Sequence, residues 1–182
     1  ILHVSGISLA ISPSACDACF AAMRLAREVG VSVSFDTNLR TRLWPADRAR
    51  AIIHEAVRLA DVLLPGFDDA TALTGLTDPH EIVSFYKKLG PRIVALTLGP
   101  DGALVADGDN VHEIPPRPAK LVDASGAGDC FDGAFLARLV AGDAVPDAAR
   151  YATVAASLSV EGFGAIAPVP RHDDVKNALA AT

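Results

Sequence analysis

Apolar residues recur along this chain with two different periods, and the two periods alternate. Four short apolar runs bounded by turn residues cover residues 1–4, 31–35, 61–64 and 93–98. Segments with apolar residues at helical spacing cover residues 13–29, 45–59, 68–73 and 79–89. The short runs are typical of buried strands, and the segments between them are typical of crossover helices. The pattern therefore predicts an α/β fold with a doubly wound, mainly parallel sheet flanked by helices.

The second half of the chain continues with a hairpin and then with helices. Two short apolar segments, 103–106 and 111–114, flank polar residues and predict a β-hairpin. Helices are predicted at residues 127–140, 146–160 and 172–180, and a glycine-rich segment comes directly before the first of them. No internal repeat or linker interrupts the 182 residues, so the pattern fits one domain or most of one.

Polar clusters follow three of the predicted strands, at residues 36–40, 65–69 and 98–102. Because the carboxyl ends of parallel strands meet at one edge of a sheet, we expect these clusters to share that edge. Open α/β sheets bind their ligands there. The sequence thus predicts a ligand site built from these three loops.

Composition excludes several functional classes. The formal net charge is −6 and the 16 basic residues are scattered, which indicates neither a nucleic-acid surface nor a membrane-binding patch. No apolar run is long enough to cross a bilayer. Three cysteines in a chain that needs no disulfides indicate a reducing, cytoplasmic environment. Cys16 and Cys19 have redox or metal-pair spacing, but no second pair completes a zinc site, so we interpret them as structural.

The glycine-rich segment carries the candidate chemistry. Residues 125–129 read Ser-Gly-Ala-Gly-Asp and open a strongly apolar helical stretch. Backbone N–H groups at such a helix start favour a phosphate or a developing oxyanion, and Asp129 lies beside them as a candidate proton acceptor. The alternative is structural: Ser125 caps the helix and Asp129 complements its dipole.

Residues 122–135 read Val-Asp-Ala-Ser-Gly-Ala-Gly-Asp-Cys-Phe-Asp-Gly-Ala-Phe. This segment resembles the C-terminal signature of the ribokinase-like (pfkB) carbohydrate kinases, Asp-Thr-Thr/Ser-Gly-Ala-Gly-Asp-x-Phe-x-Gly, with Ala124 as the one departure. The resemblance implies ATP-dependent phosphorylation of a sugar hydroxyl. Asp129 would be the general base, and the amides of Gly126, Ala127 and Gly128 would form the anion hole.

Other segments follow the family order. Residues 96–103, Leu-Thr-Leu-Gly-Pro-Asp-Gly-Ala, resemble the family's nucleotide-binding strand and turn. The resemblance implies an ATP site that includes Thr97, Gly99, Gly102, Ser125, Gly126, Gly128 and Ser157.

The resemblance also implies two cation sites. A monovalent cation such as K⁺ would lie at Asp123, Ser125 and Gly164, the last in a Gly-Phe-Gly-Ala loop. Residues 65–69 stand where the family has Asn-x-x-Glu, a motif linked to Mg²⁺ and phosphate, with Gly66 in place of Asn and Asp69 in place of Glu. Asp69 would then handle Mg²⁺ through water; the alternative is an acid at a helix N-terminus.

Residues 36–44, Asp-Thr-Asn-Leu-Arg-Thr-Arg-Leu-Trp, are similar to the Asp-x-Asn-x-Arg-x-x-Leu-Trp stretch of 2-keto-3-deoxygluconate kinases within this family. The substrate implied is that sugar acid, phosphorylated to its 6-phosphate. The planar fork of Arg40 suits a carboxylate, while Asn38, together with Asp36, shapes the loop on the phosphate side. Alternatively, Arg40 pairs with an acid such as Asp36, and the sugar is fructose, ribose or a nucleoside.

Residues 1–182 resemble the C-terminal, ATP-binding and catalytic portion of a ribokinase-like domain. We expect the lid and the N-terminal sugar-binding part of a typical member to be absent from them. An alternative of another class is a non-catalytic, nucleotide-binding remnant. Expected partners are a sugar or sugar acid and ATP, with no nucleic acid or membrane. Because family members often dimerise through the lid, the resemblance leaves a homo-oligomer open.

Overall fold

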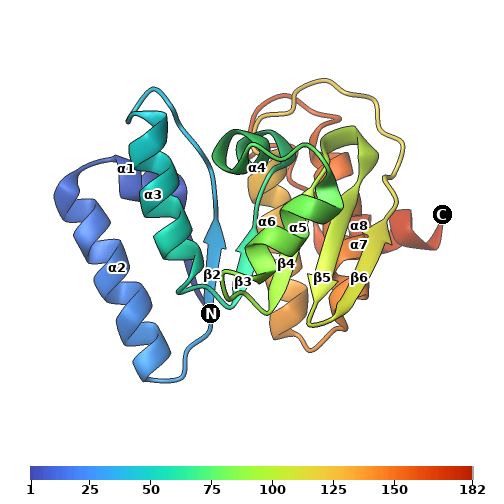
Figure 1. The fold of residues 1–182 in the computed structure, drawn as a ribbon. Helices are drawn as coiled ribbons and strands as arrows, with labels where there is room; N and C mark the ends of the chain where they lie inside the picture. Colours follow the sequence, from blue (N-terminus) through green and yellow to red (C-terminus); the bar gives the residue numbers. More distant parts are fainter. Residues whose placement is uncertain (182) are drawn as a thin grey trace. The chain divides into compact units, whose positions relative to one another are not determined.

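The structure, a computed structural model, describes residues 1–181 (Figure 1). Its strands are β1 (Leu2–Ser5), β2 (Val33–Asp36), β3 (Val62–Leu64), β4 (Ile93–Thr97), β5 (Ala103–Asp107) and β6 (Asn110–Ile114). Over the described residues they form one sheet in the order β1-β2-β3-β4-β5-β6. Strands β1 to β4 pair in parallel, so each step from one to the next needs a crossover, which helices supply. The predicted doubly wound, mainly parallel α/β fold is confirmed.

The helices agree closely with the prediction. They are α1 (Gly6–Ala10), α2 (Pro13–Glu28), α3 (Ala46–Val57), α4 (Phe67–Thr74), α5 (Pro79–Lys87), the 3₁₀ turn η1 (Gly99–Asp101), α6 (Ala127–Val140), α7 (Val145–Ser159) and α8 (His172–Ala180). The bounds of α6 and α8 are the predicted ones. The sequence did not predict α1 and η1, because elements of five and three residues are too short to reveal a period.

The chain divides into two compact units. The first unit holds residues 1–97 and 106–111. Strands β2, β3 and β4 are mostly buried, and Val33, Phe35 and Leu63 have no exposed surface. Helix α2 begins where the sequence predicted, since the Ser12 hydroxyl accepts the Ala15 N–H at 3.1 Å and Pro13 occupies the first turn.

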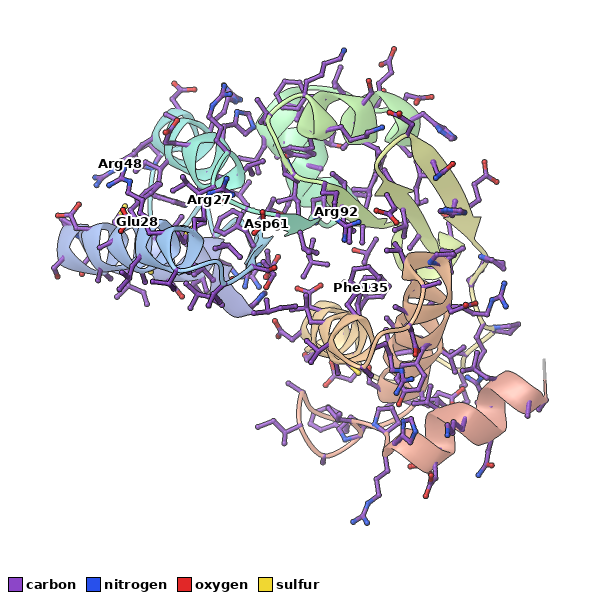
Figure 2. The ribbon with its side chains drawn as sticks, turned by 90° about the horizontal axis from the view of Figure 1, so that it is seen from below. Arg27, Glu28, Arg48, Asp61, Arg92 and Phe135 are labelled. Atoms are coloured by element: carbon purple, nitrogen blue, oxygen red, sulfur yellow. The ribbon has the colours of Figure 1, made fainter. Side chains whose placement is uncertain are left out.

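Ion pairs occupy the edge of the first unit at which its strands begin. Figure 2 views this edge, with Arg27 at the end of α2 and Asp61 just before β3 turned toward each other. Their side chains pair at 3.3 Å, and the other carboxylate oxygen of Asp61 accepts the Val33 N–H at 2.8 Å. Arg92 pairs with Asp107 at 2.7 Å. These charges join neighbouring strands, so the edge serves the fold, and the candidate site lies at the opposite ends of the strands.

The second unit holds residues 98–105 and the chain from His112 on. Its helix α6 buries Phe131 and Phe135, whose rings stack with centroids 5.8 Å apart; Phe135 is labelled in Figure 2. Helix α8 packs through Val175 against Val154 and Ala155 of α7. This packing fixes α6, which carries the glycine-rich segment at its start. Among residues 1–181, no helix combines the length and apolar character that crossing a membrane requires.

Candidate active site

In the first unit, the loop after β2 is held by a closed ring of side chains. The Ser5 hydroxyl at the end of β1 donates to Asp36 Oδ2 at 3.1 Å and accepts the Asn38 Nδ2–H at 2.9 Å. The other oxygen of Asp36, Oδ1, accepts the backbone N–H of Asn38 at 3.0 Å. The parallel pairing of β1 with β2 brings Ser5 opposite Asp36. Asp36 therefore shapes the loop, as the sequence predicted. Ser5, to which the sequence assigned no role, contributes to the same hydrogen-bond ring.

Asp69 ties the same loop to α4. It lies in the first turn of that helix, as the sequence alternative predicted, and its Oδ2 accepts the Leu39 N–H at 2.8 Å. Burial raises the pKa of Asp69, while the Leu39 N–H and the charge of Arg40 oppose that rise. The structure thus brings together Asn38, Arg40 and Asp69, which the sequence had assigned to two separate segments.

Arg40 follows this anchored turn and is exposed. Its Nη1 makes one long hydrogen bond, 3.4 Å, to the carbonyl of Leu39. Because the guanidinium is exposed, its N–H groups can receive a planar anion. Trp44, the last residue of the same 36–44 segment, is 6% exposed and belongs to the core.

Thr97 ends β4 beside the loop that follows β3. Its N–H donates to the carbonyl of Pro65 at 3.0 Å, and Thr97 pairs with Gly66 as an isolated parallel bridge. A β-carbon on Gly66 would meet the Thr97 hydroxyl oxygen at 3.8 Å, an ordinary contact. Sterics therefore do not require glycine at this position, where the family pattern has Asn.

In the second unit, Asp123 anchors two loops. Its Oδ1 accepts the Ser125 N–H and its Oδ2 accepts the Gly164 N–H, both at 2.9 Å. These two amides, followed by the Ser125 side chain, lower the pKa of Asp123. The structure therefore brings together the three residues assigned to a monovalent cation. They lie at one point of the unit, with the carboxylate held in its charged form.

The start of α6 differs from the structural alternative. The N-cap is Gly126 and no side chain caps the helix, so Ser125 is not the cap. Gly126 has φ +76°, and a β-carbon there would lie 2.9 Å from Ala165 Cβ. Only glycine fits that conformation and that space. The Ala127 N–H donates to the Ala124 carbonyl at 3.2 Å. The next N–H groups of the first turn have no intrahelical partner by the geometry of a helix start, so they are available to an anion.

Gly128 and Asp129 follow in the first turn of α6. A β-carbon on Gly128 would have nothing within 4 Å, so the fold gives no steric reason for glycine, although glycine weakens a helix. Open space here is what a phosphate approaching the amides would need. The carboxylate of Asp129 is exposed beside them, and no hydrogen bond or ion pair within residues 1–181 engages it.

Three other residues assigned to the nucleotide site are Gly102, Gly99 and Ser157, and the fold itself explains part of their conformation. Gly102 has φ +92°, and a β-carbon there would lie 2.1 Å from the carbonyl oxygen of Ile114, so the fold itself requires glycine. Gly99 begins η1 with φ +58° and open space around it. The Ser157 hydroxyl donates to the Val154 carbonyl at 2.7 Å within α7. Nothing in these contacts tests a nucleotide role, which stays a prediction for all three.

The side chains present do not form a metal cage. Within residues 1–181, no cluster of three or more His, Cys, Asp or Glu side chains could hold a metal ion. Asp69 uses one oxygen for Leu39, which leaves the other for a water molecule. A hard cation such as Mg²⁺, which keeps several waters and binds phosphates, fits these residues through water.

Comparison with known proteins gives one consistent result. The family described as "pfkB family carbohydrate kinase" matches residues 1–172. The chain is 32% identical over 183 aligned residues to 2-dehydro-3-deoxygluconokinase of Bacillus subtilis (strain 168), covering 99% of the chain and 56% of that protein. It is 34% identical to a fructokinase of Klebsiella pneumoniae, with 98% and 60% covered.

A solved structure has the same fold. The fructokinase of Vibrio cholerae O395, in a form with fructose, ADP and calcium ion bound, superposes with a TM-score of 0.91 at 32% identity. The alignment covers 98% of this chain and 60% of that one. The chain thus spans a little more than half the length of the relatives it matches.

Proposed function

Because the chain belongs to the pfkB family of carbohydrate kinases, we propose that it is the ATP-binding and catalytic part of an ATP-dependent sugar kinase. The observation that carries the proposal is the start of α6. An uncapped helix N-terminus, open space at Gly128 and an unengaged carboxylate at Asp129 stand side by side. Phosphoryl transfer needs little more from a protein than such positioning and charge stabilisation.

In the proposed reaction, the sugar hydroxyl oxygen attacks the γ-phosphorus of ATP. The bond from that phosphorus to the β,γ-bridging oxygen breaks, and ADP leaves. The hydroxyl proton passes to the carboxylate of Asp129. The N–H groups of Gly126, Ala127 and Gly128 stabilise the charge on the transferring phosphoryl group. Thr97, Gly99, Gly102, Ser125 and Ser157 are proposed to contribute to the nucleotide site.

Two cations complete the proposal. Mg²⁺, bound through the ATP phosphates and water, with Asp69 as a water-mediated ligand, would neutralise phosphate charge. K⁺ or another monovalent cation would be held by Asp123, Ser125 and Gly164. The hydrogen bonds that join Ser125 and Gly164 to the carboxylate of Asp123 support this second site, and the same amides lower the pKa of that carboxyl. The fructokinase of V. cholerae O395 was solved with ADP and a calcium ion, which supports a nucleotide and a metal in relatives.

The proposed substrate is 2-keto-3-deoxygluconate, the sugar acid also called 2-dehydro-3-deoxygluconate. Arg40 would bind its carboxylate, with Asn38 beside it, and the product would be the 6-phosphate. The B. subtilis relative, a 2-dehydro-3-deoxygluconokinase, supports this choice. A second candidate, a neutral sugar such as fructose or ribose, is favoured by the similarity to the K. pneumoniae fructokinase.

The test is ATP-dependent phosphorylation of 2-keto-3-deoxygluconate, fructose and ribose by the wild type, Arg40→Ala and Arg42→Ala. We expect Arg40→Ala to lower kcat/KM for the sugar acid by roughly 10- to 100-fold, the cost of a lost charged hydrogen bond. Arg42→Ala, which removes another exposed arginine of the same loop, is the matched control and should keep kcat/KM near the wild-type value. Equal losses with fructose would contradict a carboxylate contact. ATP binding without any turnover would instead favour a non-catalytic, nucleotide-binding part.

A further inference from the structure

The loop that carries Arg40 contains the strained point of the described backbone. Asn38 has φ +29°, and it is the one non-glycine residue with positive φ within residues 1–181. Such a conformation is rare for a residue with a side chain and persists only where its surroundings determine it. The direction of the chain through Leu39 and Arg40 depends on this turn. The contacts that hold Asn38 therefore also fix the backbone position of Arg40.

The first tether comes from β1. The Ser5 hydroxyl donates to Asp36 and accepts from the Asn38 side chain, while Asp36 also accepts the Asn38 N–H. Ser5 is thus the one member of the ring that comes from another strand. Removal of its hydroxyl would leave a part-buried carboxylate oxygen and a part-buried amide group each short of one partner.

The backbone just after β1, where α1 begins, also lies directly against the loop. A β-carbon on Gly6 would lie 2.0 Å from the carbonyl oxygen of Thr37, closer than any real contact allows. Glycine at this position lets the chain after β1 approach the loop. The Ser5-Gly6 pair therefore works as a unit, in which glycine allows the approach and serine makes the bond.

The second tether comes from α4. Asp69 Oδ2 accepts the Leu39 N–H at 2.8 Å, one residue before Arg40, and Leu39 itself is 8% exposed. The bond needs an oxygen acceptor at this place, whereas a water-mediated contact with Mg²⁺ would need the negative charge. The two roles of Asp69 can therefore be separated by a substitution that keeps the oxygen and removes the charge.

We infer that Ser5 and Asp69 are positioning residues for the sugar acid. They act on the sugar acid through Arg40 and do not contact the sugar acid themselves. The substrate part of this inference rests on the proposed function. Ser5 fixes the turn at Asn38, and Asp69 fixes the next amide, so the guanidinium is presented from an immobile backbone. Preorganisation of this kind acts on the substrate whose carboxylate Arg40 binds, and at Asp69 it is distinct from the proposed water-mediated contact with Mg²⁺, which would act on ATP.

The test compares steady-state kinetics of Ser5→Ala, Ser5→Thr, Asp69→Ala and Asp69→Asn. Ser5→Ala and Asp69→Ala should raise the KM for the sugar acid roughly 5- to 10-fold, the size expected for one lost hydrogen bond. For Ser5→Ala, which lies outside the proposed ATP and Mg²⁺ sites, the kcat and the KM for ATP should stay within about twofold. Asp69→Ala also removes the proposed water-mediated contact with Mg²⁺, so only its KM for the sugar acid tests the tether. Ser5→Thr keeps the hydroxyl and suits a strand, and Asp69→Asn keeps an oxygen acceptor. Both variants should therefore keep the KM for the sugar acid near the wild-type value.

Matched controls are Asp68→Ala, the exposed neighbour of Asp69 on α4, and Ser84→Ala, an exposed serine on α5. Both should leave the sugar KM unchanged. An unchanged KM in Ser5→Ala and Asp69→Ala would overturn the inference. An equal increase in the KM for ATP in Ser5→Ala would do so as well, because it would indicate general damage.

Backbone amide hydrogen exchange at Asn38 and Leu39 separates this inference from the kinase proposal. Faster exchange is expected in Ser5→Ala and Asp69→Ala and not in the two conservative variants. Unchanged exchange would overturn the tethers. Faster exchange in a chain that phosphorylates no sugar would overturn the proposed function, and with it the substrate role, while the tethers would stand as purely structural.

Discussion

Asp69 and Asp123 have the same task in two different surroundings. Each accepts backbone N–H groups and so fixes a loop, Asp69 through Leu39 in the first unit and Asp123 through Ser125 and Gly164 in the second. Their pKa values nevertheless move in opposite directions. Burial raises the pKa of Asp69 more than its single amide can lower it, while two amides lower the pKa of the more accessible Asp123.

The comparison shows that the pKa of a carboxyl group depends both on the hydrogen bonds that it accepts and on its burial. For Asp123, the lowered pKa means that its contribution to stability is present above the unfolded pKa and is lost as pH falls through the folded one. For Asp69, the raised pKa has the opposite sign: stability is lost as pH rises from the unfolded pKa to the folded one. The buried charge of Asp69 therefore costs folding stability, which fits a residue whose role is to hold the loop through Leu39.

Of the two loop-anchoring carboxylates, Asp123 is expected to show the larger effect. Asp123→Ala releases two loops at once, and we expect kcat/KM for ATP to fall by about a hundredfold, as for catalytic groups displaced by about 1 Å. Asp123→Asn, with one oxygen in place of two, should lie between this variant and the wild type. Asp173→Ala, an acid in the first turn of α8, is the control. Normal turnover in Asp123→Ala would show that the anchor is dispensable.

A smaller effect is expected at the loop that Asp123 anchors. Gly126→Ala forces a side chain onto φ +76° and against Ala165, so the free energy of unfolding should fall by about 1–3 kcal/mol. Gly128→Ala has free space and a helical position, and should leave stability unchanged or raise it by up to about 1 kcal/mol. Its turnover should still fall, because the new methyl group stands where phosphate would approach. Urea denaturation and kinetics of both variants check this pair, and equal stabilities would refute the steric argument.

The smallest effect concerns the pH dependence of Asp69. Asp69→Asn keeps an acceptor for Leu39 and removes a carboxylate whose charge is disfavoured by burial. At neutral pH the variant should be as stable as the wild type or slightly more stable. This advantage should disappear as pH falls below the raised pKa, where Asp69 is protonated. Denaturation midpoints measured from pH 7 to pH 4 test the sign, and an advantage that grows as the solution is acidified would reverse our assignment.

Much of the fold could be predicted from the sequence, because strand and helix periods alternate over long segments. Helix α6 is the best case: its apolar residues and the glycines before it define both ends. The short α1 gave no such signal. Ser5 and Gly6 could not be assigned either, since their partners lie about thirty residues away and meet them only when β1 pairs with β2. The rule that strand ends share an edge was the one available hint.

At the candidate site, the sequence predicted residue types better than contacts. It assigned Asp123, Ser125 and Gly164 to one place, and the structure joins them. It offered Ser125 as a helix cap, which is wrong because the backbone at Gly126 turns left-handed and takes that position. It gave Asp69 a role at a metal or a helix end, and the bond to Leu39 appeared only in the structure.

The most direct test of the central claim is phosphorylation of 2-keto-3-deoxygluconate by ATP in the wild type, Asp129→Asn and Asp147→Asn. Asp147 is the matched control, an exposed acid in the first turn of α7. If Asp129 is the general base, Asp129→Asn should lower kcat by roughly 10²- to 10⁴-fold while ATP still binds, and Asp147→Asn should keep wild-type activity. Wild-type turnover that persists in Asp129→Asn would contradict the account.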